Sequence, residues 1–484
     1  RAGKFVVHGL SSDERVGTVS DVAEQKRFFN DRVNDGSELS VREAIEMAGA
    51  RWVKEKSVEQ AEEFMRPSLS SLVQEWHVST RTASAALSPP SSPRSVAKIL
   101  ENKKNTGSNA MGSAGGGSSL EKDVNALAVD DDGCVAKVVP ERIYSVACHP
   151  SSSALVVCAG DKLGHVGIWN VDGYGVGTGS DSDGVHLFKP HNRPVVQVEW
   201  DKTGMKLLSA SYDGSVRRFD IASQKFEQIF ATYDDSECHK NHLGYGIDTG
   251  HSYWVQYLCM DHRSDGGQSF FMSTSAGTVM HVDLRDKGRI TFHEKLSEKK
   301  INSISLHPNG STMATAGLDN TVRLWDVRTF GSAKKKVSNA WEPSTSAKSF
   351  ASQNAGKSVN SAFFSPSGKS LLTTTMANYL DVTADFHLGK GVTKASTRIR
   401  HNNMTGRWLS TFMAQWHPGL HGNNEMFVVG SMKQPRTIEV FDGKTGGLLR
   451  GVSGDALTAV ASRCCFHPSA EKMVIVGGNS SGRV

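Results

Sequence analysis

A unit of about fifty residues recurs along most of this chain. Each unit opens on an apolar residue and reaches a His-Pro pair, or an equivalent pair, about six residues later. These anchor pairs are His149-Pro150, Trp200-Asp201, Met260-Asp261, His307-Pro308, Ser365-Pro366, His417-Pro418 and His467-Pro468. A tandem unit of this length cannot bury its apolar face alone, because it needs the neighbouring unit as a cover. The repeat therefore predicts an array of stacked units.

The pattern of apolar and turn residues inside each unit predicts β-strands. Short apolar runs alternate with turns such as Asp213-Gly214 and Asp319-Asn320, and third runs end in Trp169-Asn170, Phe219-Asp220, Val282-Asp283 or Trp325-Asp326. Such units close into a ring that leaves only short exposed edges. We therefore predict an all-β fold, a seven-bladed WD-repeat β-propeller over residues 124–484. Its last blade is incomplete at residues 482–484, and residues 125–139 are a candidate closing strand.

The first quarter of the chain has a different composition. Residues 1–77 are predicted to form an N-terminal extension, partly helical over 40–77, where Ser40 and Glu43 have capping-box spacing. Residues 78–123 are rich in Ser, Gly and Pro and are predicted to be a disordered linker. The chain begins at Arg1 rather than Met, so we read it as a fragment.

Bulk properties narrow the function only slightly. The net charge of +5 and pI of about 8.7 are compatible with an anionic partner. Seven cysteines without CxxC spacing indicate free, buried thiols in a reducing compartment. No apolar run approaches the roughly 18 residues needed to span a membrane. We find no pattern typical of a catalytic, metal or cofactor site, so no membrane contact, metal, cofactor or enzymatic activity is expected.

Antiparallel connectivity predicts which loops share a face. The residues that enter each first strand and the turns after each second strand lie on one face, called the upper face here. Basic, aromatic and amide residues fall there, and we predict a DNA-binding surface. Its members are Arg142, Lys162, Tyr212, Lys299, Lys300, Arg398, Arg400, His401, Asn402, Asn403, Gly406, Arg407 and Trp408. The competing interpretation is that lysines and arginines simply populate loop ends, but Trp408 argues against it.

Two third strands share an ending on the opposite, lower face: Val282-Asp283-Leu284-Arg285 and Trp325-Asp326-Val327-Arg328. A turn can use the Asp, but it does not require the Arg two residues later. We expect both arginines to project outward.

Several motifs resemble one family. They are Val139-Pro140-Glu141-Arg142-Ile143, Ser211-Tyr212-Asp213-Gly214 and above all the run from Ile399 to Leu409. They resemble the nuclear WD-repeat proteins that bind damaged DNA, a family that includes WD repeat-containing protein 76 and its fungal counterparts and is similar to the small subunit of the ultraviolet-damaged-DNA-binding complex. The resemblance covers residues 138–484. It implies a three-residue wedge at Gly406-Arg407-Trp408 and phosphate contacts at Arg142, Lys162 and Lys300.

The resemblance also implies an adaptor-binding site for cullin-type ubiquitin ligases at Asp283, Arg285, Trp325, Asp326 and Arg328. Val282 in place of Trp weakens that match, and the wedge residues differ from those of the relative. Three hypotheses follow: a nuclear propeller that binds double-stranded DNA, damaged or modified; a protein-interaction module or ligase substrate receptor with chromatin partners; and an enzyme carried on a propeller, which is the least favoured.

Overall fold

The computed structural model describes residues 119–129, 134–173, 184–232, 253–263, 268–286, 289–331, 341–383, 395–419, 425–469 and 473–484, together with three short strand segments outside them. Two of those segments, β1 (Phe5–Val6) and β2 (Val16–Gly17), pair near the start of the chain. The helices predicted over 40–77 and most of the predicted linker lie outside the described residues. Helix α5 (Ser119–Asn125) crosses the predicted boundary at residue 123.

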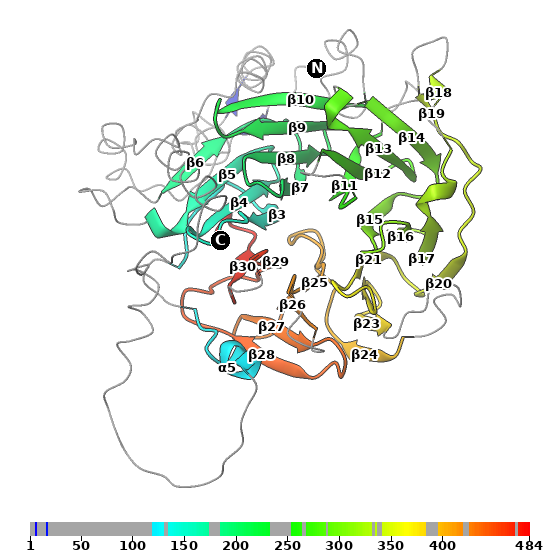
Figure 1. Ribbon diagram of the computed structural model, residues 1–484. Helices are drawn as coiled ribbons and strands as arrows, with labels where there is room; N and C mark the ends of the chain where they lie inside the picture. Colours follow the sequence, from blue (N-terminus) through cyan, green and yellow to red (C-terminus); the bar gives the residue numbers. More distant parts are fainter. Residues whose placement is uncertain are drawn as a thin grey trace, which may run out of the picture.

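Six four-stranded antiparallel sheets form the blades of a propeller. The ring is visible in Figure 1, with one strand of each blade nearest the centre. Blade 1 consists of β3 (Ile143–Cys148), β4 (Val156–Asp161), β5 (Val166–Asn170) and β6 (Val185–Phe188). Blade 2 consists of β7 (Val195–Trp200), β8 (Lys206–Ser211), β9 (Ser215–Asp220) and β10 (Lys225–Ala231). Blade 3 consists of β11 (Val255–Met260), β12 (Ser269–Thr274), β13 (Thr278–Asp283) and β14 (Arg289–Lys295).

Blade 4 takes its outermost strand from further along the chain. Blade 4 consists of β15 (Ile301–Leu306), β16 (Thr312–Gly317), β17 (Thr321–Asp326) and β20 (Ala351–Asn354). Blade 5 consists of β21 (Val359–Phe364), β22 (Leu371–Thr375), β23 (Tyr379–Thr383) and β24 (Thr397–Arg400). Blade 6 consists of β25 (Gln415–Trp416), β26 (Met426–Ser431), β27 (Thr437–Asp442) and β28 (Leu448–Val452). The pair β18 (Lys334–Lys335) and β19 (Trp341–Glu342) lies between β17 and β20. Single 3-10 turns follow β5, β13 and β17, at Val171–Gly173, Leu284–Asp286 and Val327–Thr329.

The number of complete blades is six rather than the predicted seven. The seventh repeat contributes a two-stranded sheet, β29 (Arg463–Phe466) and β30 (Ile475–Gly478). Residues 482–484 then hydrogen-bond to the segment before blade 1, where Ala136 and Val484 exchange both backbone bonds at 3.0 Å. Each anchor pair lies at or just after the end of an innermost strand. The number of anchor pairs therefore gives the number of repeats, not the number of complete four-stranded sheets. The predicted closing segment 125–139 does provide the partner residues.

Burial explains why the inner strands lack strict alternation. Every residue of β4, β12, β15, β16, β21, β22 and β26 is buried, because the adjoining blades cover both faces of these strands. Outermost strands such as β10 mix buried and exposed residues. Small side chains (Ala, Ser, Thr and Gly) therefore recur on the second strands, where two sheets approach closely.

Two histidines of the His-Pro pairs, His149 and His307, join one blade to the next. His149 Nε2 donates to the Gly204 carbonyl at 2.9 Å, and His307 Nε2 donates to the Gly368 carbonyl at 3.0 Å. The Nδ1 atoms accept a backbone N–H two residues ahead, which sets the tautomer. The His149 ring also packs edge-on against Trp200 at 4.8 Å. The motif that revealed the repeat is thus an interblade contact.

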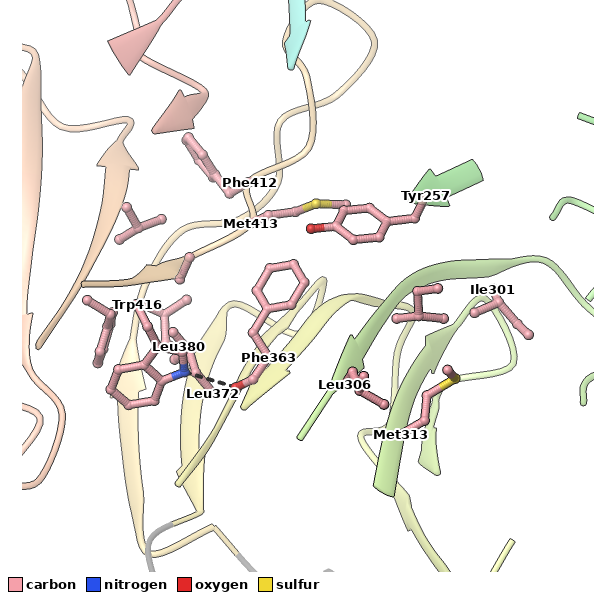
Figure 2. Close-up of a cluster of buried hydrophobic side chains, with 14 of the residues drawn as sticks. Tyr257, Ile301, Leu306, Met313, Phe363, Leu372, Leu380, Phe412, Met413 and Trp416 are labelled. Atoms are coloured by element: carbon pink, nitrogen blue, oxygen red, sulfur yellow. Dashed lines mark hydrogen bonds between the residues drawn. The ribbon is translucent and has the colours of Figure 1, made fainter. Parts of the chain in front are cut away.

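Blades 3, 5 and 6 meet in an apolar cluster near the centre of the ring. Tyr257, Phe363 and Met413, from blade 3, blade 5 and the segment that leads into blade 6, point toward one another (Figure 2). The rings of Tyr257 and Phe363 lie 5.7 Å apart. The Trp416 indole N–H donates to the Phe363 carbonyl at 2.9 Å, which ties blade 6 to blade 5. The six described cysteines are free thiols, and Cys148, Cys158 and Cys464 are buried as predicted, whereas Cys134 is exposed.

Candidate nucleic-acid interface

One backbone hydrogen bond repeats in five blades and defines the upper face. In each case the N–H of the turn after the second strand donates to the carbonyl of the residue just before the innermost strand. The pairs are Lys162 to Arg142, Tyr212 to Pro194, Ser275 to Trp254, Leu318 to Lys300 and Met376 to Ser358, all at 2.9 or 3.0 Å. Arg142, Lys162, Tyr212 and Lys300 therefore lie on the same face of the ring, as predicted.

The segment from His401 to Thr411, called the upper loop here, leaves blade 5 and runs over the ring (Figure 1, orange, before β25). Its first leg is anchored by polar side chains that face inward. Asn403 is fully buried, and its Nδ2 donates to the Thr375 and Tyr379 carbonyls at 2.8 and 3.2 Å. The buried His401 ring bonds Asn403 Oδ1 at 2.7 Å. These two predicted contact residues are therefore structural, which corrects the sequence interpretation.

The tip of the upper loop is exposed. Gly406 has a φ of 62°, a left-handed conformation that favours glycine. Trp408 is 84% exposed, more than any other large apolar side chain among the described residues. Arg407, Asn402 and Met404 are also exposed. An indole held in water gains nothing from the fold, so it is available to a partner.

The second leg is fastened to the other side of the ring. Ser410 Oγ donates to the Ile143 carbonyl in blade 1 at 2.5 Å. The Arg142 guanidinium donates to the Arg407 carbonyl, and Phe412 is fully buried in the central cluster. The tip is thus held between two anchored legs, and Arg142 acts on the upper loop as well as on the surface.

A chain of aromatic and polar contacts continues from Arg142 across three blades. Arg142 Nη2 donates to Tyr144 Oη at 2.7 Å, and Tyr144 packs edge-on against Tyr212 at 6.3 Å. Gln256 Nε2 donates to Tyr212 Oη at 3.2 Å, and the Trp254 indole N–H donates to Gln256 Oε1 at 3.1 Å. Tyr144 and Gln256 sit where the register of the innermost strand shifts, and such bulges re-aim side chains.

The predicted cations differ in how free they are. Lys162, Lys299 and Arg400 are exposed, whereas Lys300 is half-buried and burial lowers its pKa. Arg398 lies on the outermost strand of blade 5 and forms a two-armed ion pair with Asp381, both bonds at 2.8 Å. That pair raises the pKa of Arg398. Its charge is already compensated, so Arg398 is a weaker candidate than its position in the sequence indicated.

The lower face carries Asp-Arg pairs that were expected to project separately. Arg285 Nη2 bonds Asp283 Oδ2 and Arg328 Nη2 bonds Asp326 Oδ2, both at 2.7 Å. In each pair the Arg Nε bonds the other carboxylate oxygen, and the Arg hydrogen bonds lower the pKa of both carboxyl groups. The arginine side chains are 66% and 72% exposed. Both arginines are therefore exposed to solvent, but each is ion-paired with the Asp two residues before it.

Trp325 corrects the lower-face prediction. Its indole is 4% exposed and donates to Thr315 Oγ1 at 2.9 Å, so it packs inside blade 4 and does not reach the surface. Sequence reasoning also missed a third pair of the same geometry, Asp261 with Arg263 at 2.8 Å. Its Asp-x-Arg spacing matched the other two and could have revealed it. Within the described ranges, no three His, Cys, Asp or Glu residues are grouped to hold a metal ion, and no helix is long and apolar enough to cross a membrane.

Comparisons with known proteins agree with this architecture. The family model described as WD domain, G-beta repeat matches residues 182–220 and 288–326. Each match begins beside or within the outermost strand of one blade and ends with the third strand of the next, so a sequence repeat spans two blades.

The chain is 34% identical over 355 residues to WD repeat-containing protein 76 of Xenopus laevis, covering 72% of this chain and 53% of the relative. It is 31% identical to the mouse protein of that name, over 74% of this chain and 50% of the relative. It is 28% identical to DNA damage-binding protein CMR1 of Chaetomium globosum, over 73% and 65%. The chain spans about half the length of the vertebrate relatives it matches. It is therefore a WD40-repeat protein, a homologue of the proteins named WD repeat-containing protein 76 and DNA damage-binding protein CMR1.

Proposed function

We propose that this propeller binds double-stranded DNA across its upper face and probes weakened or damaged base steps with the tip of the upper loop, Gly406-Arg407-Trp408. The observation that carries the proposal is Trp408, an indole 84% exposed on a loop whose two legs are anchored to different blades. The names of the fungal relatives, which state that they bind damaged DNA, support the same reading. We further propose that the protein acts in the nucleus.

The physical mechanism has two parts. Exposed Lys162, Lys299 and Arg400 neutralise phosphates and release counterions, which gives salt-dependent affinity without sequence preference. An aromatic side chain inserted between base pairs must unstack them at a cost of a few kcal/mol, and the cost is smaller where the duplex is already weakened. Because both ends of the upper loop are anchored, its backbone loses little conformational entropy when the tip is inserted. Preference for distorted DNA then needs no base-edge contacts.

The test is a salt series on charge-neutralised variants. Lys162→Gln and Lys299→Gln each remove one exposed cation from the upper face, so each is expected to reduce the slope of log K against log salt by about 0.9. The matched control is Lys225→Gln, an exposed lysine on the outermost strand of blade 2. Binding is measured by mobility shift with intact and ultraviolet-treated copies of one duplex. Slopes that stay unchanged in both upper-face variants would remove the site from this face.

A second candidate function has its own observation. The exposed pairs Asp283-Arg285 and Asp326-Arg328 have the same geometry on adjacent blades, so they form a repeated feature on the lower face. We propose this feature as a docking point for the adaptor of a cullin-type ubiquitin ligase, with chromatin proteins as further partners. Arg285→Ala with Arg328→Ala should abolish adaptor pull-down, while Arg218→Ala, which breaks an ion pair on the outer part of blade 2, should not. Pull-down that survives the double variant would reject the docking point.

A further inference from the structure

Arg463 is a cation that neither the upper-face interface nor the lower-face pairs use. It begins β29, the innermost strand of the seventh repeat. Its side chain is half-buried, and its Nε is buried with no hydrogen-bond partner. No ion pair or side-chain hydrogen bond joins Arg463 to another described residue. Burying part of a guanidinium without an anion is costly, so this position is incomplete as it stands.

The groups around Arg463 are donors as well. The guanidinium lies within electrostatic range of the phenol groups of Tyr144, Tyr212 and Tyr257, which come from three different blades. Two of these hydroxyls already accept: Tyr144 Oη from Arg142 at 2.7 Å and Tyr212 Oη from Gln256 at 3.2 Å. A phenol has one O–H, which is its remaining hydrogen-bonding capacity as a donor. Neither of those two O–H groups has an acceptor within the part of the chain that is described.

The Glu199 carboxyl lies near Tyr257 but is unsuited to pair with Arg463. Glu199 lies within electrostatic range of Tyr257 and Cys259, and its carboxyl lies near the Met260 backbone. Burial raises the pKa of Glu199 to about 7, so near neutral pH a large share of it carries no charge. The cluster therefore has an excess of donors, and none of the described carboxylates forms an ion pair with Arg463.

From this convergence of unpaired donors we propose that Arg463, with the Tyr144 and Tyr212 hydroxyls, binds a phosphate group at the centre of the ring. Arginine presents planar N–H pairs that match phosphate oxygens, and phenolic O–H groups donate to the remaining oxygens. The cluster is linked through Tyr144 and Arg142 to the upper loop, so a phosphate bound there would lie beside the loop that carries Trp408. The phosphate comes either from a DNA strand or from a free phosphate compound. The site itself does not depend on duplex binding.

Inorganic phosphate is the first probe. The melting temperature of the whole chain is compared in sodium phosphate, sodium chloride and sodium acetate at equal ionic strength. Phosphate at about 100 times its Kd should raise the melting temperature by about 3–4 °C above chloride. Arg463→Gln should lose that rise, and Arg218→Gln, which replaces a half-buried, ion-paired arginine on blade 2, should keep it. If Arg463→Gln fails to fold, Tyr144→Phe with Tyr212→Phe removes only the hydroxyls and should weaken phosphate binding at least about tenfold in calorimetry.

A second arm identifies the source of the phosphate. If DNA supplies it, inorganic phosphate competes with duplex and Arg463→Gln weakens duplex binding more than about fivefold; if a free compound supplies it, duplex binding is unchanged by the variant. No rise above chloride, an equal rise in Arg463→Gln, or an equal effect of acetate would overturn the phosphate site. Absence of duplex binding with a retained phosphate effect would reject the proposed function and leave this site standing.

Discussion

Replacing Trp408 with alanine separates binding from stability more cleanly than any other change on the upper face. Only about a sixth of this side chain is covered by the protein, because it is 84% exposed. An aromatic side chain buries roughly 150–250 Å² when fully covered, so at about 25 cal/mol per Å² the fold loses at most about 1 kcal/mol. Stacking of one base on an aromatic ring is worth about 1–3 kcal/mol, which is roughly a 5- to 140-fold change in Kd.

The assay is fluorescence anisotropy with an intact duplex and with the same duplex carrying a mismatched step, at one fixed salt concentration. We expect Trp408→Ala to lose more affinity for the mismatched duplex, because insertion is cheaper there and contributes more to binding. Phe350→Ala is the control: this ring is 44% exposed but lies outside the upper loop, just before the outermost strand of blade 4. If Trp408→Ala remains folded and binds both duplexes as tightly as the wild type, the indole is not a wedge.

Three further predictions concern stability. Burial lowers the folded-state pKa of His293 to about 4, so the unfolded chain takes up the proton first as the pH falls from 6.5 to 4. Over that pH range the wild type should lose about 3 kcal/mol of unfolding free energy relative to His293→Leu, as measured by urea titration. Burial raises the folded-state pKa of Glu199 to about 7, so the folded state keeps its proton longer and stability falls as the pH rises from 4.5 to 7. The unfolding free energy of Glu199→Gln should therefore exceed that of wild type by up to about 3 kcal/mol at pH 8 and match it at pH 4. Equal stabilities at pH 8 would contradict this. Gly482 and Gly356 both have positive φ, but a Cβ at Gly482 would lie 1.9 Å from the Val139 carbonyl oxygen, whereas a Cβ at Gly356 would meet nothing within 4 Å. Gly482→Ala should therefore lower the melting temperature clearly more than Gly356→Ala. Similar losses would mean that the contact of residues 482–484 does not hold the ring closed.

The repeat determined most of the fold, for a local reason. His149 and His307 bond the turn of the next blade, so in these two units a short local motif carries the contact that joins two blades. The loops that share the upper face also followed from strand direction alone. The same counting could not give the number of complete blades, because the seventh repeat pairs with residues 136–138, which lie more than 300 positions earlier in the chain.

By itself, the sequence predicted a WD-repeat ring, the loops that share its upper face and the segment that carries Trp408. Only the tertiary structure decided which side chains of that segment point outward: Asn403 enters blade 5 and Trp408 stays in water. The strand rule of alternating faces does not extend into a loop, where direction depends on which distant backbone atoms accept hydrogen bonds. Arg463 illustrates the same limit, because its lack of a partner depends on tyrosines from three other repeats, which no local pattern brings together.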